Sequence, residues 1–535
     1  MPGNYDHDES MEENNIFHHE EMSAEEDKDF YEAMQAMLTT GLVADSSMLH
    51  DLLTDDGIID DDESAEQKNE PDFLVHDDTY GRRHDLDEQV RQIYENILTR
   101  APEHKVQPSL ERVEYCLQLM GNPHKAYRSI HITGTNGKTS TARMCEALLR
   151  ERGLRTGRFT SPHLVNVRER ICIDGQAISQ ESFLSAWEDV APFIEMTDEH
   201  FAPINGVRMS FFEVFVVLAF AAFADAPVDV AVVEVGMGGT WDATNVISSD
   251  VSVVMPIAVD HEKWLGSDIE DIAEEKLGIV KEHSVFVCAQ QTEHVQQMAF
   301  DKAKEMHARY IQGGAHVHLL GREEAVGGQL ISIRTPAGVY EDIPLPLRGD
   351  HQAYNAAIAV AAVEAFFDGR ALDGEVVERA FLGVSSPGRL EVVRSSPVVV
   401  LDACHNPHGA HALAQSVEEY WPGRRIAVVS MMADKDIEGI LAELEPSFDA
   451  VVITAMNEER AADPEDIAII ARDIYGSERV IVREDVLEAI ALAGDLLEED
   501  DSTPMASGAV VVCGSIMLIG HVRKMLGVHH PDGVM

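Results

Sequence analysis

Hydrophobic residues first recur at helical spacing from about residue 85. One face of this first predicted helix carries Val90, Ile93, Ile97 and Leu98. A second amphipathic run covers residues 110–120. The ordered part of the chain is therefore expected to begin near residue 85.

Two series of short apolar runs have the length of strands. The first series lies at 129–133, 228–235, 251–257 and 284–288. The second series lies at 398–402, 426–431, 450–454 and 509–513. Helix-patterned segments such as 139–150 separate the runs. Strands that alternate with helices predict mostly parallel sheets covered on both faces.

A turn-forming cluster separates the two series. It comprises Ser385, Ser386, Pro387 and Gly388 and follows a helix-rich segment. We therefore predict two α/β domains, at 85–386 and 387–535. The 535 residues favour two domains because a single hydrophobic core stops growing well below that length.

Charge is distributed unevenly along the chain. The formal net charge is −54, which argues against a broad surface for nucleic acid or for an anionic membrane. Residues 1–80 contain 25 Asp and Glu against Lys28 and Lys68, with few aromatic residues. We predict that residues 1–84 form an acidic, disordered tail.

The cysteines and the apolar stretches bear on where the protein works. Six scattered cysteines form no CxxC pair, which favours buried thiols in a reducing compartment. The first residues carry no basic segment followed by an apolar one. The longest apolar stretch, near 211–223, contains Glu213 and is too short to span a bilayer. We expect a cytoplasmic monomer that binds neither membranes nor nucleic acid.

The strongest local motif occupies residues 132–140, between a strand pattern and a helix pattern. Glycines at 134 and 137 let the backbone turn so that several N–H groups point inward. Lys138 adds a point charge for the β and γ phosphates of a nucleotide, and the Thr139 hydroxyl suits Mg²⁺. The glycine spacing gives the shorter GxxGK[ST] form rather than GxxxxGK[ST]. We predict a P-loop NTPase-like, mostly parallel sheet domain followed by a smaller Rossmann-like α/β domain.

Several further motifs follow this loop in a fixed order, and together they resemble the folylpolyglutamate synthase family of Mur-type ligases. The resemblance covers roughly residues 100–525. The motifs are GTNGKTS at 134–140, TSPHL at 160–164, RERI at 168–171, EVGMGGTWDATN at 234–245, DHEKWLGSDIEDIAEEKLGIVK at 260–281, GDHQAYNA at 349–356, PGRLE at 387–391, DACHNP at 402–407, DKD at 434–436 and GS at 514–515.

The resemblance implies an ATP site with bound Mg²⁺ and, as an option, a monovalent cation such as K⁺. The nucleotide residues that it implies are Gly134, Thr135, Asn136, Gly137, Lys138, Thr139, Ser140, Asn355 for the adenine, Arg389 for the phosphates, Asp402 for the ribose, and His405. The implied metal ligands are Thr139, Ser161, Glu234, His261 and Lys276. By position, Glu234 ends an apolar strand where a carboxylate suits a hard cation, with a solvated strand-end residue as the alternative, whereas His261 alone would more often be an ordinary loop histidine.

Lys276 has the most distinctive implied role. By sequence position it would be a solvated helix residue, but the resemblance implies that its amine carries a carbamate. Addition of CO₂ would turn a cation into an anion with two oxygens, which can hold Mg²⁺. Only the neutral amine reacts, so this group would be sensitive to pH and to dissolved CO₂.

The implied activity is the ATP-dependent addition of L-glutamate to dihydropteroate, to the γ-carboxylate of a (tetrahydro)folate, or to both, through an acyl phosphate. This would place the chain in folate biosynthesis. The implied catalytic residues are Lys138, Lys276, His261 and Arg389. The positions that match the acceptor-contacting segments are Ser210, Phe211, Trp241, Asp242 and Ala243.

Two other functions stay open at this point. A cell-wall Mur ligase shares the loop and the lysine chemistry, but it usually has a folded N-terminal domain for its UDP-sugar substrate. The acidic segment before residue 85 is too poor in apolar residues for such a domain. A nucleotide-binding module without catalysis would need neither a second metal site nor selectivity for glutamate.

Overall fold

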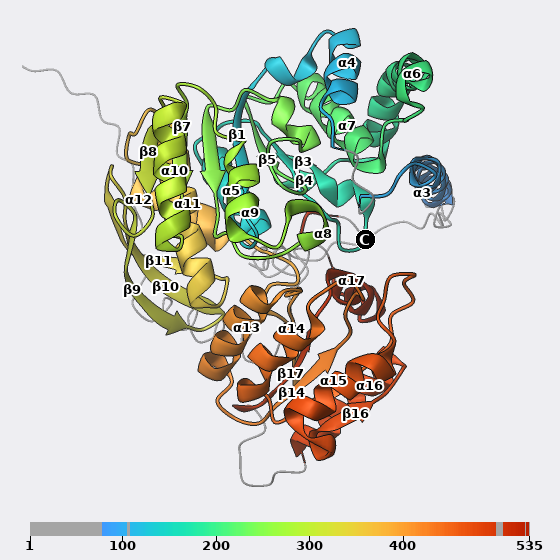
Figure 1. The fold of residues 1–535 in the computed structure, drawn as a ribbon, viewed down its shortest axis with the longest axis vertical. Coiled ribbons are helices and arrows are strands. Elements are labelled where there is room, and N and C mark those ends of the chain that lie inside the picture. The colour runs from blue at the N-terminus through green and yellow to red at the C-terminus, as the bar shows by residue number, and fades with distance from the viewer. Residues whose placement is uncertain (1–76, 104–107, 499–506, 530, 534–535) are drawn as a thin grey trace, which may run out of the picture. The chain divides into compact units, whose positions relative to one another are not determined.

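The structure, a computed structural model, describes residues 77–103, 108–498, 507–529 and 531–533 (Figure 1). Residues 1–76 of the tail predicted at 1–84 lie outside the described residues. Helix α3 (Asp77–Leu98) begins slightly before residue 85, and α4 (Glu111–Leu119) confirms the helix expected at 110–120. None of the helices described is long and apolar enough to cross a bilayer.

The first sheet has eight strands in the order β4-β3-β2-β5-β1-β6-β7-β8. The six neighbouring strands β2, β5, β1, β6, β7 and β8 pair in parallel. Strands β3 and β4 extend the sheet beyond β2 as an antiparallel edge. Four strands confirm the first predicted series: β1 (Arg128–Thr133), β5 (Val230–Glu234), β6 (Val251–Val254) and β7 (Val285–Cys288). The other four are β2 (Thr156–Phe159), β3 (Ile171–Ile173), β4 (Gln176–Ala177) and β8 (Arg309–Gln312).

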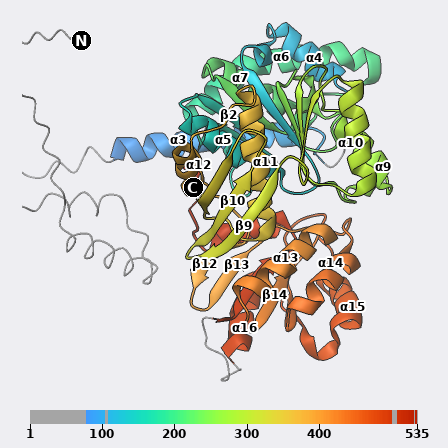
Figure 2. The ribbon, with the colours of Figure 1, turned by 90° about the vertical axis from the view of Figure 1, so that its left-hand side faces the viewer.

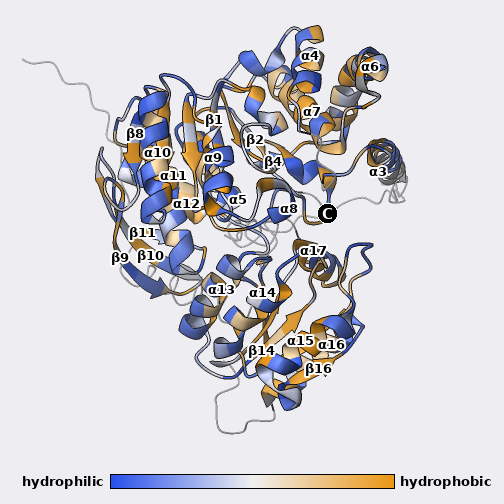
Figure 3. Ribbon diagram, viewed as in Figure 1, coloured by the Kyte–Doolittle hydropathy of each residue, from blue (hydrophilic) through white to orange (hydrophobic). Residues whose placement is uncertain are grey.

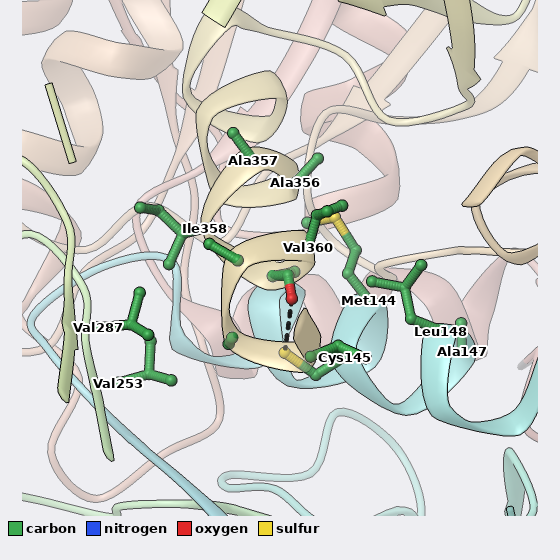
Figure 4. Packing of buried hydrophobic residues seen from close by; sticks show 14 of the residues in the cluster. Met144, Cys145, Ala147, Leu148, Val253, Val287, Ala356, Ala357, Ile358 and Val360 are labelled. Atoms are coloured by element: carbon green, nitrogen blue, oxygen red, sulfur yellow. Dashed lines mark hydrogen bonds between the residues drawn. The ribbon is translucent and has the colours of Figure 1, made fainter. Parts of the chain in front are cut away.

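Helices cover both faces of this sheet because its strands are apolar on both sides. On β5, Val232 packs into a core with α5 (Lys138–Glu151) and α11 (Asp350–Phe366), whereas Val233 packs under α7 (Phe211–Asp225). Figure 4 shows the first of these cores, in which the Cys145 thiol of α5 lies 3.8 Å from the Ala359 carbonyl oxygen of α11. The remaining large helices here are α6 (Gln180–Asn205), α9 (Ile269–Leu277), α10 (Glu293–Glu305) and α12 (Gly374–Leu382).

A three-stranded antiparallel sheet lies between the two predicted series and was not foreseen from the sequence. Its strands are β9 (His318–Ala325), β10 (Gly328–Arg334) and β11 (Val339–Leu345). Ile331 and Ile333 of β10 join the core beneath α11, which ties this small sheet to the first one.

The second large sheet has the order β12-β13-β17-β14-β15-β16. Four strands confirm the second predicted series: β13 (Val398–Leu401), β14 (Arg425–Val429), β15 (Ala450–Ile453) and β17 (Ala509–Cys513). The edges are β12 (Glu391–Ser395), which is antiparallel, and β16 (Val480–Val482). The boundary placed at 386/387 falls in the loop between α12 and β12 and stays a prediction.

In the described part of the chain, the helices that cover the second sheet pack against both of its faces (Figure 2). They are α13 (Pro407–Tyr420), α14 (Ile437–Leu444) and α15 (Pro464–Tyr475), then α16 (Val486–Glu498) and α17 (Ile516–Met525). Figure 3 shows the apolar central strands enclosed by helices that alternate between polar and apolar residues. Both large sheets thus present the carboxyl ends of parallel strands, where ligands of open α/β sheets usually bind.

A balanced cluster of buried charges involves the C-terminal end of the chain. Arg143 of α5 donates to both carboxylate oxygens of Asp532, at 2.8 and 2.7 Å. Arg158 of β2 donates to the same carboxylate at 2.8 Å and also pairs with Glu146 of α5. All four side chains are buried, and two cations face two anions.

The six cysteines are all buried and free of disulfides. Burial raises the pKa of the Cys116 thiol to about 11 and that of the Cys288 thiol to about 12. These cysteines therefore behave as small apolar side chains.

Candidate active site

A cavity of about 1400 Å³ opens at the carboxyl ends of both large sheets. Its wall includes every residue that the sequence analysis assigned to the nucleotide, the metal or the acceptor, from Gly134 in the phosphate loop to His405 after β13. Sequence segments that are hundreds of residues apart therefore converge on one cavity. The roles of the individual residues stay predictions.

The phosphate loop joins β1 to α5 and depends on its two glycines. Gly134 and Gly137 both have positive φ, at 143° and 85°. A Cβ on Gly134 would lie 2.6 Å from the Met255 side chain, and one on Gly137 would lie 2.7 Å from Oδ1 of Asn355. Thr135 anchors the loop, because its N–H donates to the Pro256 carbonyl and its hydroxyl to the Ala258 carbonyl, both at 2.9 Å.

Lys138 is the first residue of α5 and curls back over the loop. Its ammonium donates to the carbonyl oxygens of Gly134 and Thr135, at 3.0 and 3.1 Å. Burial lowers the pKa of this amine, and the nearby Arg389 adds to the effect. A cation held by neutral carbonyls beside a helix N-terminus is suited to an incoming phosphate.

Glu234 ends β5 next to the loop and is almost completely buried. The Thr139 hydroxyl donates to its two oxygens, at 2.9 and 3.1 Å, and the Ser161 backbone N–H also points to the carboxylate. Burial raises the pKa of Glu234. The alternative of a solvated strand-end carboxylate is therefore wrong.

This donor set fits Mg²⁺. The described residues contain no group of three or more His, Cys, Asp or Glu side chains that could form an all-protein metal cage. Mg²⁺ usually keeps several waters and binds through one or two carboxylates together with substrate phosphates. One buried carboxylate beside two hydroxyl residues, Thr139 and Ser161, matches that preference.

Lys276 lies near the end of α9 with a side chain that is only 4% exposed. Its amine donates to the Gly134 carbonyl at 3.1 Å. Burial and the neighbouring Lys138 lower the pKa of this amine to about 7. The alternative of a solvated helix lysine is therefore wrong.

His261 is the N-cap residue of the short helix α8 (Glu262–Leu265) and has a left-handed conformation, with φ of 55°. Such backbone strain in a residue other than glycine is concentrated at functional sites. Burial lowers the pKa of His261, and Lys435 adds to the shift. A neutral imidazole is the form that binds metals.

The second sheet contributes Arg389, Asp402 and His405. Asp402 is buried and accepts the backbone N–H groups of Leu390 and Cys404, at 3.0 and 2.9 Å. It thereby fixes the two loops that carry Arg389 and His405. Nδ1 of His405 lies 3.0 Å from the Ala403 carbonyl oxygen.

The predicted acceptor residues also line the cavity, and two of them have local structural roles as well. Ser210 caps α7, with Glu213 completing a reciprocal capping box. Asp242 accepts the backbone N–H groups of Met237 and Thr244, at 3.0 and 2.9 Å. The ring of Phe211 faces the guanidinium of Arg170 at 5.1 Å.

Sequence reasoning assigned no role to Arg170, Asp260, Asn406 or Lys435, all of which line the cavity. Arg170 is 2% exposed and donates to Nδ1 of His163 at 2.9 Å, while it also pairs with Glu103. The signal was available, because each of the four overlooked residues stands inside a quoted motif.

Comparisons with known proteins agree with this geometry. A model of the Mur ligase middle domain matches residues 208–363, and a model of the Mur ligase, glutamate ligase domain matches residues 388–516. A dihydrofolate synthase/folylpolyglutamate synthase of Mycobacterium tuberculosis is 44% identical over 80% of this chain and 92% of its own length. The chain belongs to the dihydrofolate synthase/folylpolyglutamate synthase family.

Solved structures of this family are similar as well. A Mycobacterium tuberculosis folylpolyglutamate synthase complexed with ADP and AMPPCP is 43% identical, with a TM-score of 0.79 over 83% of this chain and 99% of that one. Escherichia coli FolC in complex with DHPP and ADP is 28% identical, with a TM-score of 0.69 over 83% of this chain and 97% of that one. Members of the dihydrofolate synthase/folylpolyglutamate synthase family thus share the two-sheet α/β architecture found here.

Proposed function

We propose that this chain is an ATP-dependent amide-forming ligase that adds L-glutamate to dihydropteroate, to the γ-carboxylate of a (tetrahydro)folate, or to both. The observation that carries the proposal is the single cavity in which the phosphate loop, Glu234 and Lys276 meet. Family membership supports the choice of substrates, since the relatives named above are dihydrofolate and folylpolyglutamate synthases.

The nucleotide end of the cavity supports phosphoryl transfer from ATP. Lys138 and Arg389 would face the phosphates from the two sheets, and Asn355 lies against Gly137 of the phosphate loop. Fixed positive charge at this place would stabilise negative charge that develops on the transferred group.

Thr139, Ser161 and Glu234 would hold one Mg²⁺ ion, and His261 with carbamylated Lys276 would hold a second. When bound, Mg²⁺ supplies positive charge to the phosphoryl oxygens. Carbamylation requires a neutral amine. The lowered pKa of Lys276, about 7, provides a neutral fraction of this amine at physiological pH and so favours the carbamate.

The other end of the cavity would bind the acceptor. Phe211 and Trp241 offer aromatic surface, and Arg170 is held rigidly by Glu103 and His163. Apolar walls with a few fixed polar groups are typical of sites for small organic ligands.

In the proposed reaction, the acceptor carboxylate attacks the γ-phosphorus of ATP and releases ADP, which gives an acyl phosphate. The amine of glutamate then attacks the acyl carbon, loses a proton, and expels phosphate to leave an amide. An acyl phosphate is hydrolysed by water, so the enclosed cavity between the sheets protects it.

The test is the release of phosphate by the full chain with ATP, Mg²⁺ and glutamate. Dihydropteroate, tetrahydrofolate and a UDP-muramyl peptide should be compared as acceptors, and the amide product should be identified by mass spectrometry. We expect glutamate-dependent turnover with one or both pterin acceptors. Turnover with the UDP-muramyl peptide alone would replace the proposal by a cell-wall ligase, and ATP binding without any turnover would replace it by a binding module.

A further inference from the structure

Three loops from the two large sheets meet at one carboxylate, that of Asp260, and the phosphate loop is linked to it through Asn406. Asp260 lies in the loop after β6. Its Oδ1 accepts a hydrogen bond of 2.6 Å from the ammonium of Lys435, which lies in the loop after β14. Its Oδ2 accepts Nδ2 of Asn406, which precedes α13, at 3.0 Å. Asn406 in turn accepts Nδ2 of Asn136 in the phosphate loop at 3.1 Å.

We infer that Asp260 is a positioning residue that fixes Lys435, a cation from the second sheet, beside the phosphate loop, where it faces the acyl phosphate during amide formation. This inference rests on the proposed ligase function. It adds a residue pair that joins the two sheets at the reacting centre.

The environment of the pair supports this role. Asp260 has a side chain that is 7% exposed, and Lys435 has one that is 12% exposed, yet both line the cavity. Asp260 is the one ion-pair partner of Lys435 in the part of the chain that the structure describes. An ammonium has three N–H donors, so Lys435 retains donors for an anionic ligand in the cavity.

Asn406 couples the same carboxylate to the nucleotide loop. Its Oδ1 caps α13 by accepting the Gly409 N–H at 2.8 Å while it also accepts Asn136. A nucleotide that orders the phosphate loop would therefore also hold the loops of the second sheet that carry Asn406 and, through Asp260, Lys435.

A second ion pair in the chain provides a matched control. Arg322 of β9 pairs with Glu419 of α13 and so joins the three-stranded sheet to a helix of the second large sheet. Neither residue lines the cavity, and their side chains are 18% and 28% exposed. Loss of this pair would remove a connection between the two parts but no group at the reacting centre.

The experiment compares full-length Asp260→Asn, Lys435→Met, the double variant and Glu419→Gln. Three quantities are measured: kcat and KM for glutamate-dependent phosphate release, ATP affinity by calorimetry, and the melting temperature. We expect each cavity variant to lower kcat about tenfold to hundredfold, with ATP affinity changed less than about threefold. The kcat of the double variant should lie within about twofold of that of Lys435→Met, because the effects of substitutions at two residues that act as one unit are not additive. Glu419→Gln should keep the wild-type kcat.

Two results would overturn the inference: multiplied losses in the double variant, or a Lys435→Met enzyme with wild-type kcat. The second result applies even if Asp260→Asn does not fold. A wild-type enzyme without glutamate-dependent turnover would instead contradict the proposed function itself, so the two failures are distinguishable.

Discussion

Two groups of buried charges in this chain are built in opposite ways. In the cluster of Arg143, Glu146, Arg158 and Asp532, each charged group is bonded directly to a group of opposite charge. Around the phosphate loop of the candidate active site, by contrast, Lys138 and Lys276 donate to neutral carbonyl oxygens, and Glu234 accepts from a hydroxyl.

The presence or absence of a directly bonded countercharge distinguishes structural charges from functional ones in this chain. A buried charge without a directly bonded countercharge is costly, so its pKa moves toward the neutral form. Burial indeed lowers the pKa of Lys138 and Lys276 and raises that of Glu234. Such a site is completed by charged ligands, whereas the balanced cluster needs none. Substitutions in the balanced cluster should therefore affect stability, and substitutions of the charges around the phosphate loop should affect catalysis.

The largest expected effect is that of Lys138→Ala on turnover. Removal of a cation aimed at the phosphates should lower kcat by about a hundredfold or more. The melting temperature should stay near that of the wild type, since no carboxylate loses its bonded partner. Phosphate release and circular dichroism check the two halves of this prediction. Lys302→Ala, which changes a lysine paired with Glu305 at the surface, is the control and should be fully active.

Substitutions of Lys276 should be nearly as severe, and they test the sign of its charge. Both Lys276→Ala and Lys276→Arg should be almost inactive if the residue is an anionic carbamate. Acetate or formate should restore some rate to the alanine variant by filling the vacated space, but not to the arginine variant. Full activity of Lys276→Arg would rule out the carbamate and leave ATP binding untouched.

The pH dependence of activation follows from the same lysine. Wild-type enzyme freed of CO₂ and bicarbonate should lose activity and regain it when bicarbonate returns. Because the pKa of the amine is about 7, the neutral, reactive fraction grows as pH rises through 7. At constant dissolved CO₂, reactivation should therefore be faster at pH 8 than at pH 6. Reactivation that is independent of pH or of bicarbonate would contradict the prediction.

A stability effect without a catalytic one is expected for Asp532→Asn. Loss of this anion leaves two buried guanidinium groups with one carboxylate, and breaking such a pair costs about 3–5 kcal/mol. Chemical denaturation should reveal the loss, while kcat of the folded enzyme at 25 °C should stay within about twofold of the wild type. Glu375→Gln, at an exposed carboxylate, is the matched control. A large fall in kcat with unchanged stability would contradict the assignment of Asp532 to a structural rather than a catalytic role.

The smallest effect is expected from removal of residues 1–72. This segment is acidic and poor in apolar residues, so it has little to contribute to a core. Melting temperature and kcat should both stay close to their full-length values. A large drop in melting temperature would count against the predicted disordered tail.

Much of this fold could be predicted from the sequence because the central strands are continuous apolar runs. The segment at 509–513, for example, is a strand over the same residues in the structure. The sheet of β9, β10 and β11 escaped prediction because its strands lie partly at the surface. In β9 the segment HLLGREEA carries charges next to apolar residues, and none of its eight positions is buried, five of them being exposed.

The candidate site was predicted mainly through the ordered motifs rather than through periodicity. Lys276 illustrates the limit, because its helix reads as amphipathic and only the fold reveals that the side chain is buried. The contact of Asp260 with Lys435 was equally hidden. It depends on loops of two separate sheets, and no spacing along the chain encodes that meeting.

The burial of all six cysteines makes the chain a convenient background for spectroscopic probes. A thiol reagent that reacts quickly with exposed thiolates would meet none of them on the folded surface. A cysteine introduced at Val326, in the turn between β9 and β10, together with one at Ile469 of α15 would offer two new surface thiols, since these residues are 94% and 58% exposed. Donor and acceptor dyes at these two positions would report, in real time, whether nucleotide and glutamate bring the β9–β10 hairpin and α15 closer together.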